Sequence, residues 1–247
     1  SLLERLDSQR GALFASSFEY PGRYTCWDIG FYNPPLVLTC KQHYINLQAL
    51  NPRGEVLLSF IYPLLVEQNY IELCSQSPSF IHIKIKTTEG LFSEEERSKQ
   101  PSTFSIIRLL LALFKSDEEP YLGLYGAFGF DLIYQFEHLI QHKARDTAQR
   151  DMVLYIPDEL FVVNHRKEEA FVRRYDFQFQ GKSTQSLPRE GIYTPYTPLY
   201  KPKQECDHQA GEYTEIVQKA KQRFACGDLF EVVPSQTFYA HYTEQPS

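Results

Sequence analysis

The sequence predicts an α+β fold in which antiparallel β-sheets are covered by helices on their outer faces. Three observations indicate this fold class. The segment FIHIKIK, residues 80–86, alternates apolar and polar side chains, as expected of an antiparallel strand with one wet face. Residues 102–115 instead place apolar side chains at helical spacing after a proline. With Phe 18, Tyr 17 and 43% hydrophobic residues, the 247-residue chain can bury a core that orders both kinds of element.

The first part of the chain predicts a short helix followed by strands. Leu2, Leu3 and Leu6 fall on one face of the helix. Asn51-Pro52-Arg53-Gly54 has a proline that sets φ and a glycine that closes a turn, so we expect a hairpin there. The aliphatic segments that predict strands in this part are residues 36–40, 44–50 and 56–62.

In the middle of the chain, strands and helices alternate. We expect Ser102 or Thr103 to cap the helix over residues 102–115. The glycine-punctuated segment 121–130 predicts a strand that leads into a helix over residues 131–142, with Asp131 at its positive end. Further strands are expected at residues 152–156, 159–163 and 170–179, with a polar turn over 164–168.

We predict three parts along the chain: an amino-terminal regulatory or structural domain over residues 1–180, a linker over 181–211, and the start of a second domain over 212–247. The linker is rich in Ser, Thr, Pro, Gln and Gly and has no periodicity. After it, apolar residues from Tyr213 to Phe224 share one helix face, Gly227 ends the helix, and residues 229–240 predict a strand.

Composition excludes several classes of function. A net charge of −6 with both signs spread along the chain gives no basic surface for nucleic acid. The longest apolar stretch, residues 106–114, is too short to cross a bilayer, and the first residues do not form a secretory signal. The five cysteines are irregularly spaced, which indicates reduced structural thiols. We therefore expect a cytoplasmic protein without a membrane partner.

Two patterns that suggest ligand binding have simpler interpretations. The Gly123-x-x-Gly126-x-x-Gly129 series lacks the Gly-Lys-Ser/Thr ending of a phosphate loop and favours close backbone packing. His138 and His142 are four apart, but Leu139 stands where a zinc protease needs a glutamate, so we expect no metal site in the chain.

Longer segments carry a specific resemblance. SSFEYPGRYTCWDIGF (residues 16–31), followed by NPPLVLTC (33–40), strongly resembles the amino-terminal segment of anthranilate synthase large subunits, especially the form fused to its glutaminase. AGEYTEIVQKAKQRFACGDLFEVVPSQTFYA (210–240) resembles the opening of the chorismate-binding module of this enzyme family. GLYGAFGFDLIYQFE (123–137) and DMVLYIPDELFVVNHR (151–166) extend the resemblance over essentially the whole chain. It implies the amino-terminal part of such an enzyme, with an incomplete anthranilate/aminodeoxychorismate synthase-like fold.

Enzymes of this family convert chorismate to an aminated product with ammonia from a partner glutaminase and a Mg²⁺ ion held by carboxylates. The resemblance implies that the Mg²⁺ ligands and catalytic residues lie beyond Ser247, so we expect this chain alone to be inactive and to bind no Mg²⁺. Its implied partners are a glutamine amidotransferase domain or subunit, chorismate and tryptophan, and an exposed surface would permit a homodimer. The alternatives are an aminodeoxyisochorismate synthase of phenazine type, or a non-catalytic module that binds an effector and assembles with a partner chain.

The resemblance also assigns roles to particular residues. Glu231 stands where relatives that use water as nucleophile have a lysine that can act as a base, which fits an enzyme that uses ammonia. Tryptophan commonly inhibits the family, and the matching effector residues are Leu13, Ser16, Ser17, Tyr20 and Cys26. Ala15 replaces a glutamate and Cys26 an arginine, although Arg23 is near in sequence. We therefore expect tryptophan inhibition to be weakened or absent.

Overall fold

The computed structural model describes residues 1–15, 27–86, 95–96, 99–137, 139–141, 144–197 and 201–245. It divides into two compact units, Ser1–Pro195 and Tyr196–Pro246. The first unit contains two larger antiparallel sheets, a small two-stranded one and helices, which confirms the predicted α+β class. Within the described residues, no helix is both long and apolar enough to cross a membrane.

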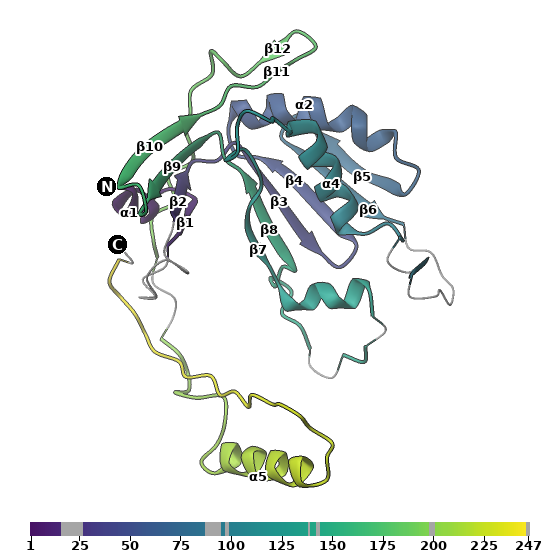
Figure 1. The fold of residues 1–247 in the computed structure, drawn as a ribbon, viewed down its shortest axis with the longest axis vertical. Helices are drawn as coiled ribbons and strands as arrows, with labels where there is room; N and C mark the ends of the chain where they lie inside the picture. Colours follow the sequence, from purple (N-terminus) through teal and green to yellow (C-terminus); the bar gives the residue numbers. More distant parts are fainter. Residues whose placement is uncertain are drawn as a thin grey trace. The chain divides into compact units, whose positions relative to one another are not determined.

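A six-stranded antiparallel sheet forms the larger part of the first unit (Figure 1). Its order is β5-β6-β4-β3-β8-β7, and the strands are β3 (Leu36–Lys41), β4 (Tyr44–Ala49), β5 (Ile71–Ser77), β6 (Phe80–Ile85), β7 (Tyr125–Phe128) and β8 (Met152–Ile156). The predicted alternation in β6 is confirmed, because Ile81, Ile83 and Ile85 are buried and the side chains between them are partly exposed.

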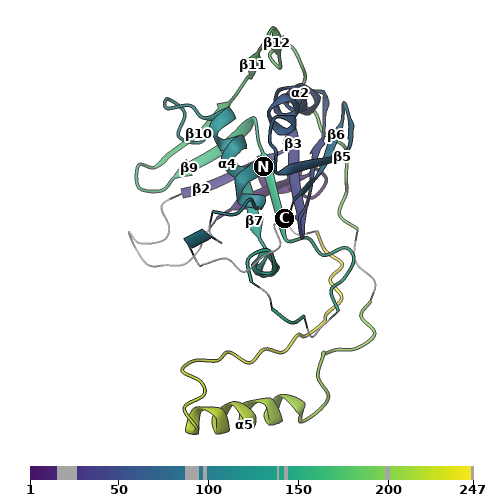
Figure 2. The same cartoon turned by 90° about the vertical axis from the view of Figure 1, so that its right-hand side faces the viewer.

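Two helices, α2 (Pro52–Val66) and α4 (Thr103–Phe114), cover one face of this sheet (Figures 1 and 2). Leu57 and Ile61 of α2 and Ile106 and Leu110 of α4 pack with the buried sheet residues in one hydrophobic core. Ser102 is the N-cap of α4, as predicted, and its backbone N–H donates to the Ser105 hydroxyl at 3.1 Å. The opposite face carries polar residues such as Asn46 and His82.

The expectation of a hairpin at residues 51–54 and a strand at 56–62 is wrong, because this segment begins α2. The Asn51 side chain accepts from Gly54 N at 3.1 Å, and Pro52 occupies the first helical turn, where a missing N–H costs nothing. The residues that favour a turn are therefore those that start a helix. Gly54 is required by space, since a Cβ there would lie 2.0 Å from the Pro35 carbonyl oxygen.

A four-stranded sheet of order β1-β2-β9-β10 completes the first unit. Its strands are β1 (Gly11–Phe14), β2 (Trp27–Tyr32), β9 (Glu159–Asn164) and β10 (Glu169–Arg174). Its inner face holds a second core around Phe31, Leu160 and Val162, which reaches the six-stranded sheet through Tyr155. The short helix α1 (Leu2–Leu6) lies against β1 and β2.

Several predicted elements are shorter in the structure. The strand expected over 121–130 is reduced to β7, and the helix expected over 131–142 is the 3-10 helix η1 (Phe130–Gln135). The strand expected over 170–179 divides into β10 and β11 (Gln178–Phe179), which pairs with β12 (Lys182–Ser183). The first compact unit extends to Pro195, so it includes residues 181–195 of the predicted linker. The functional division at residues 180 and 211 stays a prediction.

The second unit contains the amphipathic helix α5 (Glu212–Ala225), as predicted. Gly227 follows it with φ of 77°, a left-handed conformation that suits glycine at a helix end. The prediction of a strand over residues 229–240 is wrong. In the described part of this unit, that segment makes one isolated bridge, Cys206 to Phe238, because no neighbouring strand is available to continue the ladder.

Candidate functional site

The structure describes only one of the expected effector residues. Leu13 lies in β1 opposite Gly30 of β2 and is 37% exposed. Ser16, Ser17, Tyr20 and Cys26 lie outside the described residues. The role of these residues therefore stays a prediction.

Leu13 lines an open apolar hollow on the outer face of the four-stranded sheet. The hollow has a volume of about 340 Å³ and is lined by Leu2, Leu13, Asp28, Phe161, Val162, Val163, Ala170, Phe171 and Val172. Its carboxylate, Asp28, is paired with His165 Nε2 at 2.9 Å. This surface can therefore offer apolar contact and one carboxylate that already has a partner.

An aromatic cluster occupies the inner face of the same sheet, at the strand ends that precede and follow residues 16–26. Phe14 packs on Tyr125 with ring centroids 6.2 Å apart, and Trp27 packs edge-on against Tyr121 at 5.9 Å. Burial raises the pKa of Tyr125, whose hydroxyl donates to the Tyr121 carbonyl. The cluster supplies apolar surface. Its residues come from distant segments of the chain, so no local sequence pattern indicated it.

Buried Arg53 joins the start of α2 to the segment that follows β10. Its guanidinium forms an ion pair with Asp158 and donates to the carbonyls of Tyr175 at 2.8 Å and Thr184 at 2.6 Å. Burial opposes ionisation of Asp176, but the hydrogen bond from Arg53 and the charges of Arg189 and Arg53 together outweigh it and lower the pKa of that carboxyl. Arg53 thereby ties the start of α2 to Asp158 and to the backbone at Tyr175 and Thr184, which is a structural role.

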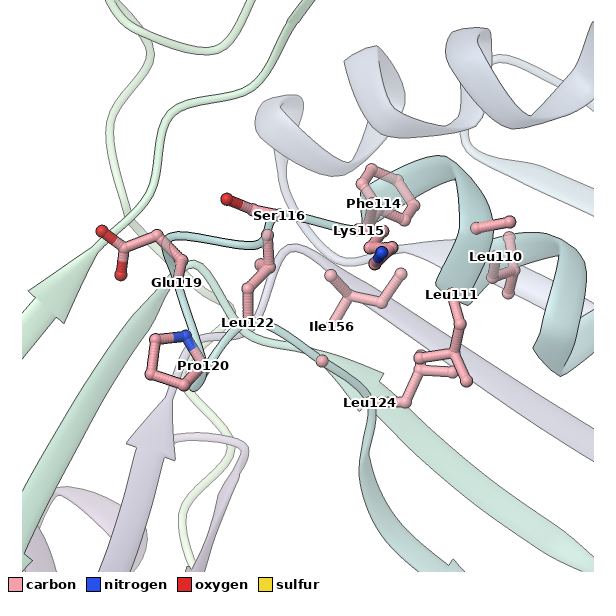
Figure 3. A pocket seen from close by; sticks show the side chains of 12 residues that line it. Leu110, Leu111, Phe114, Lys115, Ser116, Glu119, Pro120, Leu122, Leu124 and Ile156 are labelled. Atoms are coloured by element: carbon pink, nitrogen blue, oxygen red, sulfur yellow. The ribbon is translucent and has the colours of Figure 1, made fainter.

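A second hollow of about 340 Å³ lies between the end of α4 and residues 119–124 (Figure 3). Leu110, Phe114 and Leu122 form its apolar wall, with Ile156 at the base. Lys115 and Glu119 also line it, and Lys115 pairs with Asp117 at 2.8 Å. The lining combines an apolar wall with charged side chains but contains no histidine or cysteine, and it gives no acid–base pair suited to catalysis.

Glu231, the other residue singled out from the sequence, lies in the second unit on an exposed segment outside any strand. Across the described ranges, no three His, Cys, Asp or Glu side chains come together as metal ligands.

Comparison with known proteins gives a consistent result. Residues 71–247 match the family described as chorismate binding enzyme. The chain is 39% identical over 246 residues to anthranilate synthase of Azospirillum brasilense, which covers 100% of this chain and 34% of that protein. It is 28% identical over 217 residues to anthranilate synthase component 1 of Serratia marcescens, with 82% of this chain and 41% of the relative covered.

Anthranilate synthase component 1 of Escherichia coli is 26% identical over 219 residues, which cover 82% of this chain and 41% of that protein. The chain thus spans less than half the length of these relatives. The family match covers more than half of the chain, and the identity to the Azospirillum protein continues through both compact units. The chain belongs to the chorismate binding enzyme family.

Proposed function

We propose that this chain is part of an anthranilate synthase, which converts chorismate and ammonia to anthranilate and pyruvate in tryptophan biosynthesis. The observation that carries the proposal is the 39% identity over 246 residues to a protein named anthranilate synthase. The Serratia and Escherichia coli relatives, which are named anthranilate synthase component 1, extend this support.

Within the complete enzyme, this chain contributes the scaffold and one wall of the site. The described residues bring no set of carboxylates and histidines together, so the residues present do not fit a Mg²⁺ site. We therefore place the Mg²⁺ ligands and the catalytic residues in the remainder of the enzyme and assign no step of the reaction to this chain. The isolated chain is proposed to be inactive.

The proposed nucleophile is ammonia, delivered by a glutamine amidotransferase domain or subunit. Glu231 supports this choice, because an exposed carboxylate replaces the lysine that would activate water. Neutral ammonia is a stronger nucleophile than neutral water and needs no such base. Glu231→Gln in the complete enzyme should therefore leave ammonia-dependent activity within about twofold, as measured by anthranilate fluorescence. A loss of activity as large as that from removing a catalytic group would contradict this assignment.

We also propose that tryptophan binds weakly or not at all, because Ala15 and Cys26 replace two charged residues of the effector site. Titration calorimetry of the complete enzyme with tryptophan tests this. Ala15→Glu combined with Cys26→Arg should strengthen binding. Tight binding of tryptophan by the unchanged enzyme would show that Ala15 and Cys26 do not weaken the effector site. For the complete enzyme we propose a cytoplasmic location, which the irregular spacing of the cysteines supports.

The activity is tested with the complete enzyme, chorismate, Mg²⁺ and ammonium, by following anthranilate fluorescence and pyruvate in the same sample. Equal amounts of both products are expected. An aminated product without pyruvate would identify instead an aminodeoxyisochorismate synthase of phenazine type. If neither compound forms and calorimetry shows an effector bound, the chain is part of a non-catalytic effector-binding module.

A further inference from the structure

Strand β10 is an edge strand whose outer side is open. It pairs with β9 on one side and ends the four-stranded sheet, and no strand in the described part of the chain pairs with its other side. Ala170, Val172 and Arg173 are exposed. An edge strand with unpaired backbone groups is a template for another strand.

The charges on this edge are ordered along the strand. Glu169 stands at its start and Arg173 and Arg174 at its end, with the uncharged residues Ala170, Phe171 and Val172 between them, and Arg174 is already paired with Glu159 of β9. Charges of a single sign along an edge would repel a second copy in any register. Separated charges repel a parallel copy but attract an antiparallel one, because the acidic end of each strand then faces the basic end of the other.

We propose that β10 pairs with β10 of a second copy of this chain, antiparallel across a two-fold axis at Phe171, to form a continuous eight-stranded sheet. The two-fold axis requires paired residues to point to the same face, so their numbers have the same parity. In the register centred on Phe171, Glu169 faces Arg173 of the second copy. No other register of this symmetry places Glu169 opposite an arginine of β10.

The uncharged residues also fit this arrangement. The two Phe171 rings meet at the axis, and cross-strand aromatic pairs stabilise antiparallel sheets. On the outer face, Val172 of one copy lies beside Ala170 of the other, which joins the apolar surfaces around Val163 and Leu13 across the axis. Arg173 already lies over the Phe171 ring, with its Cζ 5.0 Å from the ring centroid, so its charge is held near the proposed contact.

Sedimentation velocity of the 247-residue chain over a concentration series tests the proposal through two charge reversals. Glu169→Arg places arginine opposite arginine in its own dimer, and Arg173→Glu places glutamate opposite glutamate. Each variant should self-associate roughly tenfold or more weakly than the unchanged chain. Circular dichroism and thermal melting establish that both variants are folded.

The decisive sample is an equimolar mixture of the two variants. In the mixed dimer every arginine at positions 169 and 173 faces a glutamate, so the mixture should dimerise as strongly as the unchanged chain while each variant alone does not. Misfolding cannot produce this recovery. The proposal is overturned if the unchanged chain is monomeric throughout the series, if either variant dimerises normally, or if the mixture stays monomeric. These outcomes are independent of chorismate turnover and therefore of the proposed function.

Discussion

At the scale of single residues, Arg53 shows how a charged side chain can be fully buried when every donor has a partner. Arg53→Met removes the cation and leaves Asp158, which is 2% exposed, with Arg189 as its remaining ion-pair partner at 3.6 Å. Because an uncompensated buried carboxylate is costly, we expect the free energy of unfolding in urea to fall by about 3–5 kcal/mol.

Arg189→Met is the matched control, since this side chain is 26% exposed and lies at the border of the same cluster. Arg189→Met should lower the free energy of unfolding by clearly less than Arg53→Met does. Equal losses for the two variants would show that burial of the Arg53 guanidinium does not determine its contribution.

Tyr175 makes stability sensitive to alkaline pH. Burial, together with the charge of Glu119, raises its pKa from 10.0 to about 12. Between these values the unfolded chain loses the phenol proton while the folded chain keeps it, so the stabilising contribution is complete below pH 10 and is lost as the pH rises toward 12.

Tyr175→Phe should therefore flatten the fall in unfolding free energy over this alkaline range, measured by urea unfolding at successive pH values. Tyr193→Phe, at a side chain that is 71% exposed, is the control and should follow the unchanged protein. Parallel curves for all three proteins would rule out a role for Tyr175.

At the scale of elements, the interpretation of the Gly123-x-x-Gly126-x-x-Gly129 series as close backbone packing is confirmed at Gly126 and wrong at Gly123. A Cβ on Gly126 in β7 would lie 1.9 Å from the Val153 carbonyl oxygen of β8, whereas a Cβ on Gly123 would meet nothing within 4 Å. We expect Gly126→Ala to destabilise the protein by about 1–3 kcal/mol or more, because β7 must shift against β8.

Gly123→Ala is the control within the same series and should change stability by less than about 0.5 kcal/mol. Thermal unfolding of both variants measures the difference. A tolerated alanine at position 126 would mean that the spacing between β7 and β8 is adjustable.

Local patterns predicted elements well where the signal lies within one segment. The alternation of β6 and the apolar faces of α4 and α5 each lie within one segment, so they were sufficient to predict these three elements. The start of α2 was predicted wrongly because Asn, Pro and Gly serve a turn and a helix N-terminus equally well. Residues 229–240 were predicted as a strand from composition, but a strand also needs a neighbour that composition cannot supply.

At the scale of the whole molecule, the sequence predicted the fold class and the family, whereas the site could be predicted only in part. Ser16 and Cys26 were identified through resemblance and lie outside the described residues. The aromatic cluster around Phe31 and the Arg53 cluster depend on contacts between distant segments. Such contacts leave no periodic signal in a single sequence, so only the structure showed them.

The central claim is that this chain belongs to an anthranilate synthase whose reactive groups lie in the rest of the enzyme. The most direct test compares the 247-residue chain with the complete enzyme, each supplied with chorismate, Mg²⁺ and ammonium, by fluorescence of the product. The account predicts anthranilate from the complete enzyme and none from the chain alone. Turnover of chorismate by the chain alone, or no product from the complete enzyme, would contradict it.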